Sequence, residues 1–537
     1  MIHKDCRIDG FRPWRKPICG SLYAMNVFGR LMKMGNAVFK KSNWKKTFYY
    51  LKKNGLKSAY YAAMERLARE KAANYSYQPP PEEELERQRK EAEKYPYTFS
   101  ILVPAYETNP VFLREMLDSV LRQTYFKLEL IVADASASEQ VKEVMETYDD
   151  KRLRYVNIAG NKGISANTNA ALAKAEGEYV GLLDHDDVLT PNALYEMAKA
   201  ISEKEKNGNT AWMLYSDEDK GNGDCTQFYE PHFKQDLNMD LLLSNNYICH
   251  FLVMKRSLIK SLGFRPEYDG AQDFDLVLRA AGRLLYETKE QRRDLMREWE
   301  NAGRAAIVYV PKVLYHWRCH TQSTAENPES KRYAYDAGRR AVQDFINSRG
   351  WKASVSDSLH LGFYRIAYEG GIFSQRPEVG VIGGKILSTG GKIAGGIYDE
   401  NGVSIYEGLH KEYSGYMHRA TLLQEAYAVD VRCMKVRKEL WSLFEEISGV
   451  PYAEDEHTGY FAHERYFNKK HFNEKSHLVK RMRREIMGRE KTWIDADAGN
   501  EELKKLSMNF CERVRKMGYT VVFEPEVSVK LTKSPRR

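Results

Sequence analysis

The chain has 537 residues and a mass of 62.2 kDa, a length that suggests about three domains rather than one hydrophobic core. With 43% hydrophobic and 29% charged residues, 35 Tyr and 21 Phe, it is not a disordered chain. Its 7 cysteines are scattered and form no CxxC pair, which argues against a zinc ribbon or a disulfide scaffold. No run of about 18 apolar residues lacks a charge and no secretory signal opens the chain, so we expect a cytoplasmic protein without a membrane-spanning helix.

The net charge of +9 is concentrated in the N-terminal part of the chain. Apolar and aromatic residues from Trp44 to Leu67 follow a loosely helical spacing with lysines between them. Such a basic helical segment can lie on an anionic surface at the inner face of the membrane, or it can pack on the next domain. Three prolines, Pro79 to Pro81, and a charged helix follow. We place the end of this basic helical N-terminal region and linker, residues 1–94, before Tyr95.

Buried strands alternate with helices in the next part of the chain. The pattern predicts strands at 99–103, 128–133, 153–158 and 179–183, with helices at 111–123, 139–148 and 165–175. This alternation indicates a parallel α/β sheet, in which ligands bind at the carboxyl ends of the strands. The fourth strand runs directly into Asp184-His185-Asp186-Asp187. Carboxylates at a strand end suit Mg²⁺ or Mn²⁺, because these hard cations prefer oxygen ligands.

Seven segments follow one another from residue 100 onward: SILVPAYETNPVFLREMLDSVLRQTY, ELIVADASAS, NKGISANTNAAL, GEYVGLLDHDDVLTPNAL, YSDEDK, GAQDFDLVLR and VLYHWRCHTQST. In order and spacing they resemble glycosyltransferase family 2, over about residues 97–350. The resemblance implies a GT-A fold, a Rossmann-like mixed sheet flanked by helices, for residues 95–355. It also implies a metal-dependent, inverting transfer of a hexosyl or deoxyhexosyl group from a nucleotide-sugar donor. The acceptor would be a hydroxyl of a growing cell-surface polysaccharide or lipid-linked glycan.

The resemblance also assigns roles to individual residues. Asp273 matches the general base that deprotonates the acceptor hydroxyl. Asp186 and His316 match the ligands of an Mn²⁺ or Mg²⁺ ion. Residues that match the donor-binding site are Pro104, Ala105, Tyr106, Asp134, Asn161, Gly163, Asn167 and Asp184. Residues at possible supporting positions are Asp187, Asp217, Asp219, Gln272, Asp275 and Arg318.

Several of these residues have a simpler interpretation. Asp187 is equally a helix N-cap before the segment 189–200. Asp217 and Asp219 are equally solvated turn residues, and a lone histidine such as His316 is more often structural. Gln272 stands where the family more often has Glu, which weakens the case for that position but not for its neighbour.

The end of the chain echoes the second half of the first domain. Residues 434–443 resemble 252–262, and residues 509–531 resemble 275–283 followed by 306–317. In this alignment Ser507 replaces Asp273. We therefore expect residues 356–537 to form a truncated, degenerate glycosyltransferase-like region with partial GT-A-like α/β structure and no catalytic acids.

Two other functions fit the sequence less well than sugar transfer. The segment SILVPAYETNP lacks the glycine-rich basic loop of a nucleotidyltransferase. A non-catalytic scaffold or glycan-binding subunit of a polysaccharide-synthesis complex is the alternative, and the retained acids speak against it. The basic stretch 463–491 is either a solvated helix or a surface for membrane or polymer. No nucleic-acid module accompanies the basic N-terminus, so no nucleic-acid partner is expected.

Overall fold

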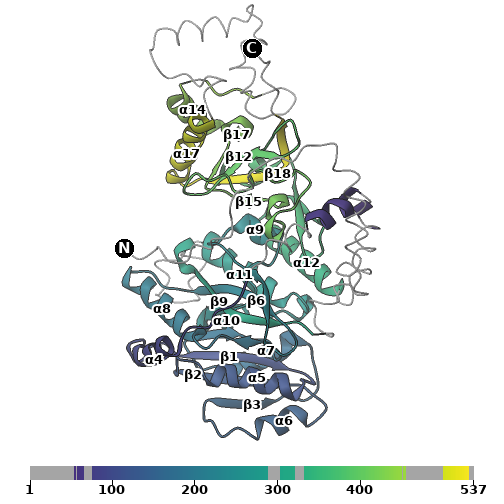
Figure 1. The fold of residues 1–537 in the computed structure, drawn as a ribbon, viewed down its shortest axis with the longest axis vertical. Helices are drawn as coiled ribbons and strands as arrows, with labels where there is room; N and C mark the ends of the chain where they lie inside the picture. Colours follow the sequence, from purple (N-terminus) through teal and green to yellow (C-terminus); the bar gives the residue numbers. More distant parts are fainter. Residues whose placement is uncertain are drawn as a thin grey trace, which may run out of the picture. The chain divides into compact units, whose positions relative to one another are not determined.

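The computed structural model describes residues 75–287, 303–320, 332–449, 451–454 and 500–530, together with parts of 52–65 (Figure 1). The chain divides into two compact units. The nine-strand unit comprises Ala73–Asn238 and Asn245–Ile366, and the five-strand unit comprises Met1–Ala72, Met239–Ser244 and Ala367–Arg537. Half of the predicted basic helical segment 44–67, and the stretch 463–491, lie outside the described residues. Within the described part of the chain, no helix is long and apolar enough to cross a membrane.

The nine-strand unit is built on one mixed sheet. Its strand order is β3-β2-β1-β4-β8-β6-β9-β5, with β7 paired to β6. The strands are β1 (Phe99–Ala105), β2 (Leu128–Asp134), β3 (Leu153–Asn157), β4 (Tyr179–Leu182), β5 (Val188–Leu189), β6 (Met213–Gly221), β7 (Phe228–His232), β8 (Leu252–Lys255) and β9 (Ile307–Arg318). Neighbouring strands among β1 to β4 are parallel, whereas β8 is antiparallel to both β4 and β6. The predicted mixed α/β sheet is therefore confirmed.

Helices flank this sheet and follow the strands in the predicted alternation. They are α4 (Glu82–Glu91), α5 (Pro110–Leu121), α6 (Gln140–Met145), α7 (Ile164–Lys174), α8 (Ala193–Lys206), α10 (Arg256–Leu262), α11 (Gln272–Tyr286) and α12 (Arg332–Ser348). The start of α5 shows how the sequence sets a boundary: the Asn109 side chain accepts a hydrogen bond from Val111 N, and Pro110 occupies the first turn. A separate ribbon pairs β10 (Ala353–Asp357) with β11 (Tyr364–Tyr368).

The five-strand unit has its own sheet and core. Its sheet has the order β13-β12-β18-β15, with β17 beside β12, and a second small sheet pairs two further strands. The strands are β12 (Val379–Leu387), β13 (Ile393–Gly395), β14 (Ile397–Tyr398), β15 (Gln424–Glu425), β16 (Ala428–Val429), β17 (Met434–Val436) and β18 (Thr520–Lys530). The helices are α9 (Met239–Ser244), α13 (Ile372–Gln375), α14 (Trp441–Ser448) and α17 (Asn500–Lys516).

Helix α9 belongs to this unit although its residues lie between β7 and β8 in the chain. All six of its residues are buried. Asp240 forms a fully buried ion pair with Arg376, and Met239 N donates to the Glu425 carboxylate at 3.0 Å. Ser244 Oγ also reaches the backbone oxygen of Leu423. The helix is therefore held at both ends by residues more than a hundred positions later in the chain.

The two sheets share an order of strand pairings. In the nine-strand unit, β6 pairs antiparallel with β8 and parallel with β9. In the five-strand unit, β12 pairs antiparallel with β17 and parallel with β18. Helices α14 and α17 stand in chain order where α10 and α11 stand. The pairing order thus agrees with the sequence echo between the two segments.

The described residues between 52 and 65 pack within the five-strand unit. Residues 57–65 are helical, and the carboxylate of Glu65 accepts hydrogen bonds from the backbone nitrogens of Ser414 and Gly415. Lys57 pairs with Glu412 at 2.7 Å. Packing on the protein, one of the two alternatives for the basic segment, therefore describes this short stretch.

One buried lysine predicts a measurable stability effect. Lys385 on β12 is 6% exposed, and among the described residues its ammonium group has no hydrogen-bond or ion-pair partner. Burial lowers its pKa from 10.5 to about 8, with Glu412 opposing the shift. Lys385→Met should raise the free energy of unfolding by about 3 kcal/mol at pH 7, because each unit of pKa difference corresponds to about 1.4 kcal/mol.

The pH dependence follows from the sign of that shift. Below the folded pKa of about 8, both states carry the proton and the full penalty is present. As pH rises toward 10.5, the folded state loses its proton first, so the advantage of Lys385→Met should shrink. Urea unfolding of both proteins at pH 7 and pH 10 measures this, with the exposed Lys392→Met as control. A less stable Lys385→Met protein would contradict the interpretation.

Candidate active site

Three carboxylates follow the carboxyl end of β4, where the sequence places them. Asp187 is buried, and its Oδ2 and Oδ1 accept hydrogen bonds from Tyr315 Oη at 2.5 Å and Arg318 N at 2.7 Å. Arg318 also donates from Nε to the backbone oxygen of Asp186. Helix α8 begins later, after Asn192, so Asp187 does not act as its N-cap. Strand β9 therefore fixes the carboxylate loop through Asp187 and Arg318.

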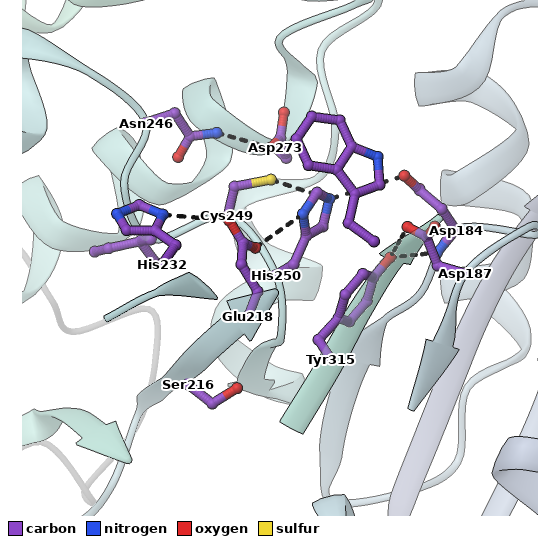
Figure 2. Close-up of polar contacts among 12 residues, drawn as sticks. Asp184, Asp187, Ser216, Glu218, His232, Asn246, Cys249, His250, Asp273 and Tyr315 are labelled. Carbon is purple, nitrogen blue, oxygen red and sulfur yellow. Dashed lines mark hydrogen bonds and ion pairs between the residues drawn. The ribbon is translucent and has the colours of Figure 1, made fainter. Parts of the chain in front are cut away.

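Strand register brings a histidine to these acids. Strands β4 and β8 are antiparallel with Leu182 opposite Leu252, so residues after β4 lie beside residues before β8. His250 Nε2 accordingly lies 3.8 Å from Asp184 Oδ2. Ligand atoms of Asp184, Asp187 and His250 all lie within 4.8 Å of one another (Figure 2). This is a donor set of two carboxylates and one imidazole, suited to a divalent cation.

The electrostatics of the acids agree with a cation site. Burial raises the pKa of Asp184, and the charges of Asp186 and Asp273 raise it further, while His250 opposes the shift. Burial also raises the pKa of Asp187 well above its usual value, with Asp186 and Asp184 adding to the shift. Carboxylates crowded in this way favour a bound positive charge.

A second histidine faces the middle acid. His320 Nε2 lies 2.9 Å from Asp186 Oδ2, and its ring packs against Phe112 with centroids 5.2 Å apart. The sequence predicts His316 as the partner of Asp186 in the metal site. Of the two histidines in HWRCH, the structure places the second one beside Asp186. His316 as a metal ligand stays a prediction.

His316 instead makes its polar contact with Asp219. Strands β6 and β9 are parallel with Asp219 opposite His316, and His316 Nδ1 lies 2.5 Å from Asp219 Oδ1. Tyr75 donates its hydroxyl to Asp219 Oδ2 at 2.6 Å, and Phe228 stacks on the imidazole with centroids 4.0 Å apart. Asp219 is fully buried, which excludes the solvated-turn interpretation. Asp217 is likewise buried and accepts hydrogen bonds from the backbone and from a tyrosine.

The predicted general base lies in the first turn of α11. Asp273 Oδ2 accepts a hydrogen bond from Asn246 Nδ2 at 2.8 Å (Figure 2). Burial and, to a lesser degree, the charge of Asp273 raise the pKa of Asp184 and of Cys249. Gln272, by contrast, accepts a hydrogen bond from Gly270 N and serves the local turn.

The side chain of Asp275 points toward the end of α10. It is buried and forms ion pairs with Arg265 and Arg279, the latter at 2.6 Å. Arg279 also donates to the backbone oxygens of Leu262 and Gly263. Asp275 therefore ties α11 to the end of α10 rather than facing the β4 acids.

The predicted donor-binding residues cluster at the ends of β1, β2 and β3. Asp134 Oδ2 accepts a hydrogen bond from Tyr155 Oη at 2.9 Å, which fixes the carboxylate at the end of β2. Asn161 Oδ1 accepts from Gly163 N and from Asn167 Nδ2. Gly163 has φ +95, and a Cβ there would collide with Asp269, so the loop requires glycine. Pro104 and Ala105 end β1, and Tyr106 follows half exposed.

A network of charged side chains contacts His250 on the side of its Nδ1 atom. This network is not predicted from the sequence. Glu218 on β6 contacts His250 Nδ1 at 3.1 Å and His232 Nδ1 at 3.3 Å. Although burial opposes the shift, the charge of Lys234 and the hydrogen bonds of both histidines lower the pKa of Glu218. Figure 2 shows His250 between Glu218, Cys249 and the β4 acids. In YSDEDK the side chains alternate across the strand, which separates Glu218 from its two acidic neighbours. No motif in the sequence marks His250.

Part of the chain is similar to proteins that are already known. Residues 100–263 match the family model described as Glycosyl transferase family 2. The uncharacterized protein y4gI of Sinorhizobium fredii is 37% identical over 254 residues, which cover 46% of this chain and 25% of that protein. The O-antigen biosynthesis protein RfbC of Myxococcus xanthus is 30% identical over 275 residues, which cover 50% of this chain and 19% of that protein.

A third relative carries a specific enzymatic name. UDP-Glc:alpha-D-GlcNAc-diphosphoundecaprenol beta-1,3-glucosyltransferase WfgD of Escherichia coli is 31% identical over 170 residues, covering 31% of this chain and 64% of that protein. The chain spans a quarter or less of the length of the first two relatives. Motif order, strand order and family match agree on one segment. Residues 100–263 of the chain are thus similar in sequence to glycosyltransferase family 2.

Proposed function

We propose that the nine-strand unit transfers a sugar from a nucleoside diphosphate donor to a hydroxyl group of a glycan, with inversion at the anomeric carbon. The observation that carries this proposal is that the segment before β8 contacts both acids: Asn246 donates a hydrogen bond to Asp273 at 2.8 Å, and His250 Nε2 lies 3.8 Å from Asp184 Oδ2. A carboxylate that accepts a proton and a carboxylate cluster that serves the diphosphate end of the donor are thus present together.

We assign parts in this reaction to a few residues of the nine-strand unit. Asp134 and the Asn161 to Asn167 loop bind the nucleoside at the ends of β2 and β3. Asp273 takes the proton of the acceptor hydroxyl, whose oxygen then bonds to the anomeric carbon while the bond to the diphosphate breaks. The electron pair of that bond leaves with the nucleoside diphosphate. Attack from the face opposite the leaving group inverts the anomeric configuration.

The carboxylate and imidazole side chains of the site are suitable ligands for a divalent cation, Mn²⁺ or Mg²⁺. The residues that would hold it are Asp184 and Asp186 with the imidazoles that face them, His250 and His320. Asp187 lies in the same cluster as Asp184 and His250, and each of its oxygens keeps a lone pair beside the one hydrogen bond that it accepts. When bound, the cation would neutralise the negative charge that develops on the departing diphosphate.

The acceptor is proposed to be a cell-surface polysaccharide or its lipid-linked precursor. The support is a relative named for O-antigen biosynthesis and another named as a glucosyltransferase acting on a diphosphoundecaprenol-linked sugar. The predicted contact of the basic N-terminus with the inner face of the membrane stays a prediction. Pelleting with anionic liposomes at low salt tests it, because screening by salt should release the protein.

We also infer that the five-strand unit is a partial copy of the same fold without its chemistry. The support is the shared order of strand pairings together with the sequence echo. Ser507, which aligns with Asp273, is fully buried and accepts a hydrogen bond from Val431 N. A serine in this environment does not act as a general base near neutral pH.

A donor panel tests the proposed function. UDP-, GDP- and dTDP-sugars are incubated with the full chain and Mn²⁺ or Mg²⁺, and release of the nucleoside diphosphate is measured. We expect one nucleotide class to be hydrolysed, and a chelator to suppress the release by at least about tenfold until metal is restored. If no nucleotide sugar binds with or without metal, the nine-strand unit is inactive. The non-catalytic scaffold function then replaces sugar transfer.

A further inference from the structure

The proposed base has one polar partner whose chemistry is unusual. Asn246 Nδ2 donates a hydrogen bond to Asp273 Oδ2 at 2.8 Å. An ionised carboxylate only accepts hydrogen bonds, so the amide must turn its nitrogen toward Asp273. The other end of the amide, Oδ1, is then buried, and among the described residues it has no hydrogen-bond partner.

An unpaired buried amide oxygen is unfavourable for folding. Nearly all buried polar atoms in native proteins are paired, and exceptions concentrate where a side chain serves a function. An apolar residue of the same size, such as leucine, would remove the unpaired oxygen. The fold alone therefore gives no reason for an amide at position 246, whereas the hydrogen bond to Asp273 does.

Hydrogen bonds fix the backbone segment on the C-terminal side of Asn246. The buried Lys234 donates from Nζ to the backbone oxygens of Ile248 and Cys249, the latter at 2.6 Å. Tyr247 Oη accepts a hydrogen bond from the backbone nitrogen of Asn238 at 2.9 Å. Asn246 thus stands on a fixed loop rather than a freely moving one, as a group that aims a carboxylate should.

From this geometry we propose that Asn246 is a positioning residue for the base. It holds Asp273 Oδ2, so that the remaining oxygen, Oδ1, is directed toward the acceptor hydroxyl. The inference rests on the proposed function, because it assigns Asp273 the proton-accepting role. Asn246 itself touches no reacting atom.

Asn246→Leu provides the test, with the surface substitution Asn207→Leu as its control. We measure kcat and KM with the donor that the panel identifies, donor affinity by calorimetry, and the thermal midpoint Tm. We expect kcat of Asn246→Leu to fall roughly 10- to 100-fold, because a misplaced catalytic group costs up to about a hundredfold. Donor affinity should stay within about twofold and Tm should not fall. Asn246→His, which restores a ring N–H at similar reach, should recover part of kcat.

Other outcomes distinguish failure of the positioning role of Asn246 from failure of the proposed function. If kcat of Asn246→Leu is unchanged while Asp273→Asn is inactive, the positioning role is wrong and the proposed function survives. If Tm and donor affinity fall together with kcat, Asn246 has a structural role and the positioning proposal is overturned. If Asp273→Asn retains full activity, the proposed base itself is wrong, and the positioning role falls with it.

Discussion

Asp273→Asn is expected to lower sugar transfer by at least about a hundredfold, since a general base contributes roughly 10²- to 10⁴-fold. Asparagine has the size of aspartate and its oxygen can still accept the hydrogen bond from Asn246, so the local structure should persist. The amide cannot accept the proton of the acceptor hydroxyl. Donor binding, which we propose depends on the residues at the ends of β1 to β4, should be unchanged.

Single-turnover kinetics with saturating donor and acceptor measure the chemical step, and calorimetry measures donor affinity. The exposed Asp224→Asn is the matched control, because it makes the same chemical change on a loop of the same unit. Turnover of Asp273→Asn within a few-fold of the unmodified protein would refute Asp273 as the base.

Asp186→Ala is expected to remove metal-dependent donor binding. Loss of an outer-shell partner alone weakens metal sites about 10- to 100-fold, so loss of a direct carboxylate should cost at least about a hundredfold. Titration with Mn²⁺, followed by the magnetic resonance signal of the free ion, measures this without any turnover. Asp224→Ala should bind Mn²⁺ as the unmodified protein does, because Asp224 lies on an exposed loop.

Two further variants decide which histidine belongs to the metal site. His320 faces Asp186 at 2.9 Å, whereas His316 is bonded to Asp219. His320→Ala should therefore weaken Mn²⁺ binding more than His316→Ala does, and His316→Ala should mainly lower stability. The reverse order would support the ligand set that the sequence predicts. Equal, full Mn²⁺ binding by Asp186→Ala and His320→Ala would contradict a cation at the β4 acids.

The first half of the fold could be predicted closely because parallel strands are buried on both faces. Such strands appear in a sequence as continuous apolar runs, and β1, with the sequence FSILVPA, is buried along almost its whole length. Predicted and observed starts agree at residues 99, 128, 153 and 179. The acids after β4 followed from the same argument, because they directly end a strand.

The contacts of His250 and Glu218 could not be predicted in this way. His250 reaches Asp184 only because β8 is antiparallel to β4, with Leu182 opposite Leu252. Glu218 reaches His250 because β6 pairs with the other edge of β8. Pairings between strands that are distant in sequence decide these contacts, and the local pattern of one strand carries no information about its neighbours. The same reason applies to Tyr75 and Asp219, which lie 144 positions apart.

Helix α9 has a consequence for the order in which the chain can fold during synthesis. Its buried residues, among them Leu241 and Leu242, pack in the five-strand unit, whose strands begin at Val379. These strands are synthesised long after α9 has left the ribosome. Until then the apolar helix has no native partner, and the segment that carries Asn246 is anchored at one end only. A protein shortened after residue 366 would keep this exposed helix permanently. We expect such a fragment to aggregate or to need a chaperone, even though the nine-strand sheet is complete within it.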